Sequence, residues 1–127
     1  IVSTNLEKYK DSIEIIHSDV FDFNPNFLYK FITMGEVLEH VEDPRGVLKL
    51  IYSFLAHNGK AYISTCTNCP AIDHVYHFKT IDEIREMICS EGFRIDSEVI
   101  EPAECCSEEK LIKRKIDILY GAIISKG

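Results

Sequence analysis

The sequence predicts an α/β fold with a mostly parallel β-sheet. The first reason is that short apolar segments with strand character alternate with longer amphipathic segments of helical period. The second reason is that one apolar run, residues 31–34, stops at a glycine and is followed by acids and a histidine. Open α/β sheets bind ligands just beyond the carboxyl ends of their parallel strands, so a site is expected at this junction.

The N-terminal part of the chain predicts a short helix, a strand and a turn. Thr4 and Glu7 have the spacing of a capping box, in which both side chains accept hydrogen bonds from unpaired N–H groups, and this favours a helix over residues 5–10. Residues 13–16 (IEII) are a short strand candidate. Residues 24–26 (NPN) predict a turn, because proline and the residue before it both resist helix.

The middle of the chain predicts a strand, a helix and a second strand. Residues 31–34 are the central strand, and Asp43 is expected to cap a helix with Pro44 at its first position, where a missing N–H costs nothing. Residues 58–59 (NG) are expected to end this helix, and residues 60–65 (KAYIST) to form the next strand. The apolar face of the helix consists of Val47, Leu48, Ile51, Tyr52 and Leu55.

The C-terminal part predicts a helix and two strands. Thr80 and Glu83 make a second capping box, and Gly92 is expected to close the helix that follows it. Residues 93–100 alternate between apolar and polar side chains, which is typical of a strand near a sheet edge. Residues 116–125 are the most continuous strand-like run and are expected to lie further in. The apolar stripe of the helix is Ile81, Ile84, Met87 and Ile88.

Composition and charge narrow the class of protein. A length of 127 residues favours one domain, and 46% hydrophobic content is enough for a core. The net charge is −7, and the one basic run, residues 110–115 (KLIKRK), follows two glutamates and is interpreted as a solvated turn. This balance argues against nucleic acid or an anionic membrane as the main partner.

Cysteine usage and the chain's start indicate compartment and extent. An odd count of five cysteines, without a signal-peptide pattern or an apolar run of membrane length, favours reduced thiols and a cytoplasmic location. The chain lacks a starting Met and opens within a pattern. Residues 1–127 are therefore expected to be the C-terminal portion of one incomplete domain of a longer protein.

The segment 31–44 (FITMGEVLEHVEDP) resembles the strand-four region of the class I S-adenosylmethionine-dependent methyltransferases, in their small-molecule branch. The resemblance extends from about residue 13 to residue 124. It implies a Rossmann-like sheet with a final antiparallel strand, which residues 116–125 would insert beside the fifth strand. It also implies S-adenosylmethionine as cofactor and methyl transfer to an O, N, S or C atom of a small-molecule or carrier-bound acceptor.

The resemblance implies a set of cofactor-binding residues. Asp19, after the strand candidate 13–16, would accept from the adenine amine, and the Val20 N–H would donate to the same base edge. Met34, Gly35 and Glu36 would lie beside the methionine half of the cofactor, with Gly35 allowing close backbone approach. Two alternatives remain open from the residues themselves. Asp19 also fits a helix cap or a solvated loop acid, and Glu36 fits an acid at a helix start.

The loop of residues 66–78 (CTNCPAIDHVYHF) looks like the family's active-site loop, and the resemblance implies catalytic and substrate roles there. His74 or His77 would act as the general base, since a neutral imidazole near pH 7 can take the acceptor's proton. His40, Asn68 and Tyr76 would contact the substrate. Alternatively, His40 is a packed or surface histidine, and the loop histidines make loop-fixing hydrogen bonds.

A zinc site is the rival interpretation of the same loop. Cys66, Cys69, residues 105–106 (CC), His74 and His77 are all possible ligands. The cysteines at 105 and 106 are adjacent, however, which departs from the paired C-x-x-C pattern. The sequence therefore predicts no metal site.

The sequence departs from the family pattern at its N-terminal side. The glycine-rich turn after strand one and the strand-two acid are missing, and Lys30 stands where the family usually has an aspartate. Half of the cofactor site is thus absent, so these residues alone are expected to be inactive. If nothing preceded Ile1, the strands would also expose an apolar edge and patch, which predicts dimerisation or aggregation of these residues expressed alone. The alternative function is a non-catalytic methyltransferase-like binding domain.

Overall fold

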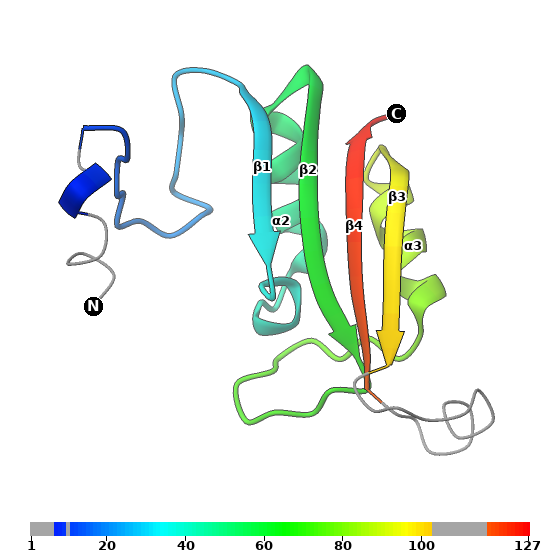
Figure 1. The fold of residues 1–127 in the computed structure, drawn as a ribbon. Helices are drawn as coiled ribbons and strands as arrows, with labels where there is room; N and C mark the ends of the chain where they lie inside the picture. Colours follow the sequence, from blue (N-terminus) through cyan, green and yellow to red (C-terminus); the bar gives the residue numbers. More distant parts are fainter. Residues whose placement is uncertain (1–6, 10, 103–116) are drawn as a thin grey trace.

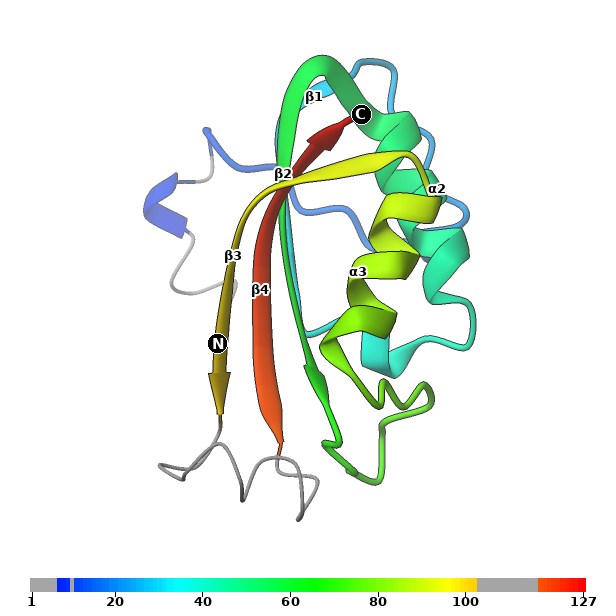
Figure 2. The same ribbon diagram turned by 90° about the vertical axis from the view of Figure 1, so that its right-hand side faces the viewer.

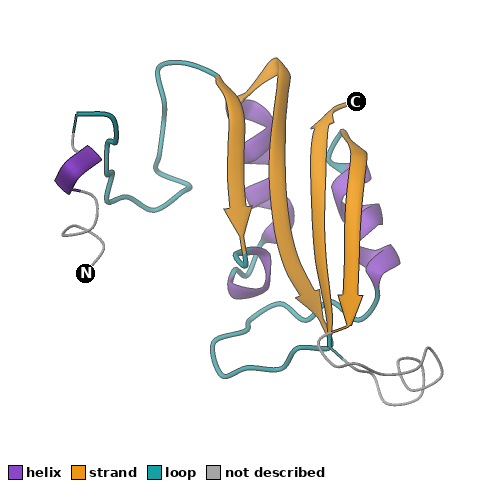
Figure 3. Cartoon of the chain, viewed as in Figure 1, coloured by secondary structure: helices purple, strands orange, loops and turns teal. Residues whose placement is uncertain are grey.

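The computed structural model describes residues 7–9, 11–102 and 117–127, which form a four-stranded sheet with helices on one side (Figure 1, Figure 3). In chain order the elements are η1 (Glu7–Tyr9), β1 (Tyr29–Gly35), η2 (Leu38–His40), α2 (Pro44–Phe54), β2 (Leu55–Thr67), α3 (Ile81–Ser90), β3 (Phe93–Pro102) and β4 (Ile118–Lys126). No helix among the described residues is both long and apolar enough to span a bilayer.

The sheet has the strand order β1-β2-β4-β3. β1 and β2 are parallel, with Gly35 paired to Ser64 at their carboxyl ends. β4 is antiparallel to both of its neighbours and lies between them. The prediction that the last strand is inserted inside the 93–100 strand, and that it alone is antiparallel, is therefore confirmed.

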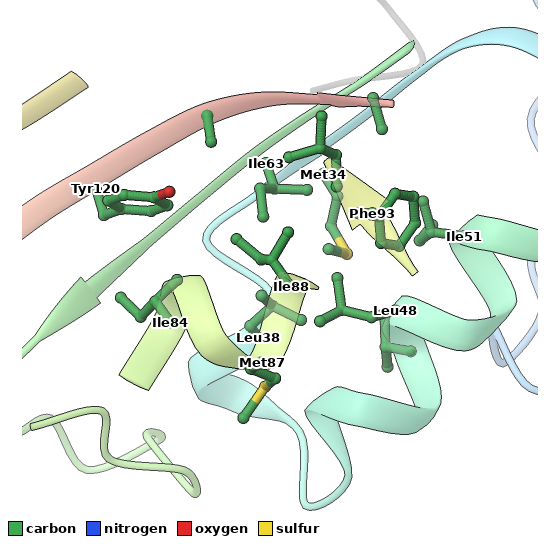
Figure 4. Packing of buried hydrophobic residues seen from close by; sticks show 14 of the residues in the cluster. Met34, Leu38, Leu48, Ile51, Ile63, Ile84, Met87, Ile88, Phe93 and Tyr120 are labelled. Carbon is green, nitrogen blue, oxygen red and sulfur yellow. The ribbon is translucent and has the colours of Figure 1, made fainter. Parts of the chain in front are cut away.

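Both α2 and α3 cover the same face of the sheet, and the hydrophobic core lies between them and the strands (Figure 2). Figure 4 shows this packing, with Met34 and Ile63 from the parallel strands meeting Leu48 of α2 and Ile88 of α3. Tyr120 of β4 is only 1% exposed and closes one end of the same cluster. The opposite face of the sheet carries no helix among the described residues.

The two predicted helix starts are confirmed by their hydrogen bonds. The Asp43 carboxylate accepts from the Gly46 N–H at 2.9 Å, with Pro44 at the first helical position. The Thr80 hydroxyl accepts from the Glu83 N–H at 3.1 Å. The Glu83 carboxylate reaches back to the Lys79 N–H at 2.9 Å, one residue earlier than the usual capping-box partner.

The predicted end of the first long helix at residues 58–59 is wrong. α2 stops at Phe54 and passes directly into β2, so that the Leu55 side chain, which is 0% exposed, enters the core. Gly59 lies inside β2, where a Cβ would meet the Leu55 side chain at 2.8 Å and the Tyr29 carbonyl oxygen at 2.9 Å. This glycine therefore allows close packing inside a strand instead of capping a helix.

The predicted strand at residues 13–16 is also wrong. These residues form no ladder with any described strand, and Ile13, Ile15 and Ile16 are 41%, 66% and 51% exposed. Figure 1 shows this segment running apart from the sheet on the free side of β1. A strand needs a neighbour to pair its N–H and C=O groups, and none of the described residues supplies one. Of the helix predicted over residues 5–10, residues 7–9 form the 3₁₀ helix η1, and residues 5, 6 and 10 lie outside the described residues.

Candidate functional site

Gly35 and Glu36 lie at the carboxyl end of β1, where the chain leaves the sheet. Glu36 has a left-handed backbone (φ 52), an uncommon conformation for a residue with a side chain. Its N–H donates to the Ser64 carbonyl oxygen at 3.0 Å, and the Ser64 hydroxyl donates to Glu36 Oε1 at 2.7 Å. A Cβ at Gly35 would lie 3.4 Å from Ser64 Oγ, which is an ordinary contact. The ends of the two parallel strands are thus tied together at an open backbone position.

The surroundings of the Glu36 carboxyl group shift its pKa. Partial burial is the main cause that raises its pKa above the ordinary value, and the neighbouring Glu39 carboxylate raises it further. The hydrogen bond from Ser64 and the charge of His40 act in the opposite direction. A carboxyl with a raised pKa beside a second acid at a strand end is a common sign of a functional site.

Glu39 is an acid inside the protein, only 1% exposed, and it holds the loop that follows β2. The Thr65 hydroxyl donates to Glu39 Oε2 at 2.8 Å. The Glu39 carbonyl oxygen accepts from the N–H groups of Val75 and Tyr76 at 2.8 and 3.0 Å. Its other carboxylate oxygen, Oε1, has no hydrogen-bond partner in the part of the chain that the structure describes.

The loop after β2 is closed at its base. Thr67 and Phe78 form an isolated parallel bridge, and the Asn68 N–H donates to the Phe78 carbonyl oxygen at 2.9 Å. Asn68 also adopts a left-handed backbone (φ 52), and its side-chain amide donates to the Lys79 carbonyl oxygen at 3.3 Å. The predicted substrate residue Asn68 thus holds the loop through its own contacts.

Of the three predicted histidines, His40 and His74 are in contact, and His77 is not part of this pair. The His40 and His74 rings stack edge to face with centroids 4.7 Å apart. His40 Nδ1 lies 2.9 Å from the Asp73 carbonyl oxygen and 3.5 Å from its carboxylate. His74 is half-buried, whereas His77 is exposed to solvent. Tyr76, also predicted for substrate, directs its hydroxyl to Glu83 Oε1 at 3.4 Å.

The predicted adenine-binding residues lie in a separate turn. Asp19 Oδ1 accepts from the Phe21 N–H at 2.8 Å, and the Asp19 carbonyl oxygen accepts from Asp22 at 3.1 Å. Val20 packs partly against the core. Among the described residues no hydrogen bond or ion pair joins Asp19 to the group around Glu36. The Met34 side chain packs in the core, and Met34 is 7% exposed. A ligand at this strand end would therefore contact the Met34 backbone and not its side chain.

A hollow of about 230 Å³ lies on the uncovered face of the sheet, and Glu36 is one of its lining residues. Sequence reasoning missed most of its lining, although the alternation in KAYIST does place Tyr62 and Ser64 on one face. Gly121 keeps the hollow open, since a Cβ there would lie 3.1 Å from the Tyr62 hydroxyl. The lining residues are Glu36, Tyr62, Ser64, Val99, Glu101, Leu119, Tyr120 and Gly121.

Three of the possible metal ligands named from the sequence do come together. One donor atom from each of Cys66, Cys69 and His74 lies within 4.8 Å of the other two. The cysteines at 105 and 106 lie outside the described residues. His77 is not a member of this group.

The chain belongs to the methyltransferase domain family, because the family model matches residues 3–98. The matched stretch contains the strand ends, the acids and the loop described above. No protein of curated function matches the sequence.

Solved structures share the fold at low sequence identity. An S-adenosylmethionine-dependent methyltransferase from Clostridium acetobutylicum is 11% identical with a TM-score of 0.67, covering 98% of this chain and 70% of its own. The O-methyltransferase of a trans-AT PKS multienzyme of Brevibacillus brevis, solved with S-adenosyl-L-homocysteine, is 15% identical with a TM-score of 0.70, covering 98% and 54%. The [4+2]-cyclase SpnF is 8% identical with a TM-score of 0.73, covering 98% and 61%. The chain therefore has the fold of this group and spans about half to two thirds of the length of most of these proteins.

Proposed function

We propose that the protein is part of a longer enzyme that transfers a methyl group from S-adenosylmethionine to a small-molecule or carrier-bound acceptor. The observation that carries the proposal is the junction at the carboxyl ends of β1 and β2. There Gly35 and Glu36 lie beside Ser64, in the position where α/β sheets bind their ligands. Membership of the methyltransferase domain family supports the same reaction.

The cofactor would lie across the end of β1. The Gly35 backbone and the Glu36 carboxylate would contact its methionine half, where a carboxylate can accept from an ammonium group. Asp19 and the Val20 N–H would read the adenine edge, with Asp19 Oδ2 available because Oδ1 is used within the turn. The S-adenosyl-L-homocysteine bound to the Brevibacillus brevis neighbour supports this choice of cofactor.

The acceptor would lie under the loop that carries the histidines. In methyl transfer the acceptor's O, N, S or C atom forms a bond to the methyl carbon as the sulfonium–carbon bond breaks. A neutral imidazole of His74 or His77 would take the acceptor's proton, and alignment would supply most of the remaining rate. His40, Asn68 and Tyr76 would shape the acceptor side, with Asn68 and Tyr76 also bracing the loop.

Substitutions in the full-length protein should separate the two halves of the site. Asp19→Ala removes a charge-assisted hydrogen bond worth about 1.5–3 kcal/mol, so cofactor binding by calorimetry should weaken by roughly 10- to 150-fold. His74→Ala and His77→Ala should keep cofactor affinity. The one that is the base should lower turnover by about 100-fold or more and remove the acidic limb of the pH profile.

The assay would follow transfer of a labelled methyl group to a panel of small hydroxyl, amine and thiol acceptors. Full turnover in both histidine variants, with an unchanged pH profile, would show that the loop covers the site without supplying a base. Unchanged cofactor affinity in Asp19→Ala would remove Asp19 from the cofactor site.

A binding domain without methyl transfer is the second candidate. The fold does not by itself require methyl transfer, since the neighbour SpnF has the same fold and is named as a cyclase. Cofactor calorimetry together with the methyl-transfer assay, both on the unmodified full-length protein, distinguishes the two. Binding of S-adenosylmethionine without turnover on any acceptor, or no binding at all, would favour this second candidate.

A further inference from the structure

We infer that Cys66, Cys69 and His74 bind a Zn²⁺ ion at the end of β2, with Glu39 as the fourth ligand. The donor atoms of the first three lie within 4.8 Å of one another. In a tetrahedral site with zinc–sulfur bonds of about 2.3 Å, two ligand sulfurs are about 3.8 Å apart. The donor atoms of Cys66, Cys69 and His74 therefore need to approach one another by about an ångström or less to bind one ion.

The fold builds this cluster through the turn between the two cysteines. Cys66 is the penultimate residue of β2 and is 3% exposed, so its position is set by the sheet. The left-handed backbone of Asn68 reverses the chain and returns Cys69 toward Cys66. The bridge between Thr67 and Phe78 closes the loop, and the His74 N–H donates to the Ala71 carbonyl oxygen at 3.1 Å. The ligands are thus held in place by backbone contacts.

Glu39 supplies an independent observation that points to a cation. A Glu39 carboxylate oxygen lies within 4.8 Å of the Cys66 sulfur, and one also lies within that distance of a His74 ring nitrogen. The carboxylate is buried, Thr65 donates a hydrogen bond to Oε2, and Oε1 has no hydrogen-bond partner among the described residues. A buried charged oxygen without a partner is costly, and an ion between Glu39, Cys66 and His74 would provide the missing interaction.

The donor set selects zinc over the oxygen-seeking cations. Two thiolates and an imidazole are ligands that Zn²⁺ prefers, whereas Mg²⁺ and Ca²⁺ prefer oxygen ligands. On binding, each thiol loses its proton to solvent as the zinc–sulfur bond forms, so no oxidant or reductant is needed. With His74 bound to zinc, the base of the proposed methyl transfer would be His77.

Cobalt titration tests the site without using enzyme activity. The protein would be treated with chelator under reducing conditions and titrated with Co²⁺, which absorbs characteristically when bound by thiolates in a tetrahedral site. We expect one equivalent to bind, with a thiolate-to-cobalt charge-transfer band that Zn²⁺ abolishes by displacing the cobalt. Cys89, an exposed thiol on α3, provides the matched control, and Cys89→Ser should bind as the unmodified protein does.

Single substitutions then assign the ligands. Cys66→Ser, Cys69→Ser and His74→Gln should each lower zinc affinity by more than the roughly 10- to 100-fold that changes next to a ligand produce. Glu39→Gln should also weaken binding, and circular dichroism would confirm that each variant is folded. Because Cys66 is buried, the more accessible Cys69→Ser variant carries the decision if Cys66→Ser does not fold.

Three results would overturn the inference. The first is no cobalt binding at micromolar protein with thiols reduced. The second is a cobalt spectrum in Cys69→Ser or His74→Gln equal to that of the unmodified protein. The third is loss of the band in Cys89→Ser. Cofactor calorimetry on the same samples is independent of these readouts, so failure of the zinc site and failure of the methyl-transfer proposal are distinguishable.

Discussion

Removing one buried hydroxyl, by Tyr120→Phe, tests how β4 is held in the sheet. The Tyr120 hydroxyl donates to Glu98 Oε2 at 2.9 Å, and Tyr120 is 1% exposed. Glu98 also accepts from Arg85 of α3, through Nε at 3.1 Å and Nη2 at 2.5 Å. This network joins β4, β3 and α3, so losing one member should lower the free energy of unfolding.

The expected cost is set by the charge and exposure of the acceptor. A hydrogen bond to a charged group contributes about 1.5–3 kcal/mol, but Glu98 keeps its Arg85 partner and its side chain is 27% exposed. We therefore expect the lower end, about 1.5 kcal/mol, or roughly tenfold in the folding equilibrium. The Arg85–Glu98 pair at this exposure adds at most about 1 kcal/mol by itself.

The cost should also depend on pH. The hydrogen bonds from Arg85, and then the one from Tyr120, hold the pKa of Glu98 below its ordinary value of 4.5. A carboxyl group whose pKa is lower in the folded state contributes stability that is complete above its unfolded pKa. That stability is lost as the pH falls through the folded pKa. The difference between Tyr120→Phe and the unmodified protein should thus be largest near neutral pH and shrink below pH 4.5.

Urea unfolding at several pH values would measure this difference, with Tyr62→Phe as the control. Tyr62 is 39% exposed on the uncovered face of the neighbouring strand, and removing its hydroxyl should change stability by less than about 0.5 kcal/mol. Equal losses in the two variants, or a Tyr120→Phe loss that stays constant into acid, would refute the reasoning.

Three further predictions concern stability and association. Thr80→Ala removes the cap of α3 and should lower the free energy of unfolding by about 1 kcal/mol, measured as a lower Tm. An unchanged Tm would show that the Glu83–Lys79 contact is enough to cap the helix. Gly92→Ala should cost about 1 kcal/mol or more because Gly92 has φ 93 and Tyr52 lies 3.1 Å from the added Cβ, whereas Gly35→Ala should be close to neutral in the same melt. Light scattering should show concentration-dependent self-association through the uncovered face of the sheet. Val99 and Leu119 are 62% and 46% exposed on this face, and the double variant Val99→Lys, Leu119→Lys should reduce the association. A monomer at all concentrations would contradict this prediction.

Local signals in the sequence were enough to predict the elements whose structure depends on local contacts. The caps at Asp43 and Thr80 follow from side chains that bond to backbone groups three residues away. The inner position of β4 follows from its apolar continuity, since a strand paired on both sides needs few polar residues. By contrast, residues 13–16 have strand composition, but a strand forms only with a partner that composition does not reveal.

The site was harder to predict because its determinants are distant in sequence. Glu39 reads as a surface acid of a short helix, yet Thr65 and the backbone at residues 75–76 enclose it. The left-handed conformations of Glu36 and Asn68 could not be predicted, because neither residue is a glycine, the residue that usually marks such a conformation. The junction after residues 31–34 was predicted, because a buried strand that ends on polar residues marks the end of a parallel sheet. The roles of the individual residues there stay predictions.

The position of β4 also affects the order in which the protein can fold during synthesis. Within the described residues β3 pairs only with β4, and β4 is made after β3 although it lies between β2 and β3. Until residues 118–126 leave the ribosome, the nascent chain can form the β1–β2 pair and the two helices, but β3 has no neighbouring strand among the described residues. The pairing of Lys60 with Ser125 closes a long loop, a contact that slows folding. Loss of residues 118–126 would therefore separate β3 from β2 in the middle of the sheet instead of removing an edge strand.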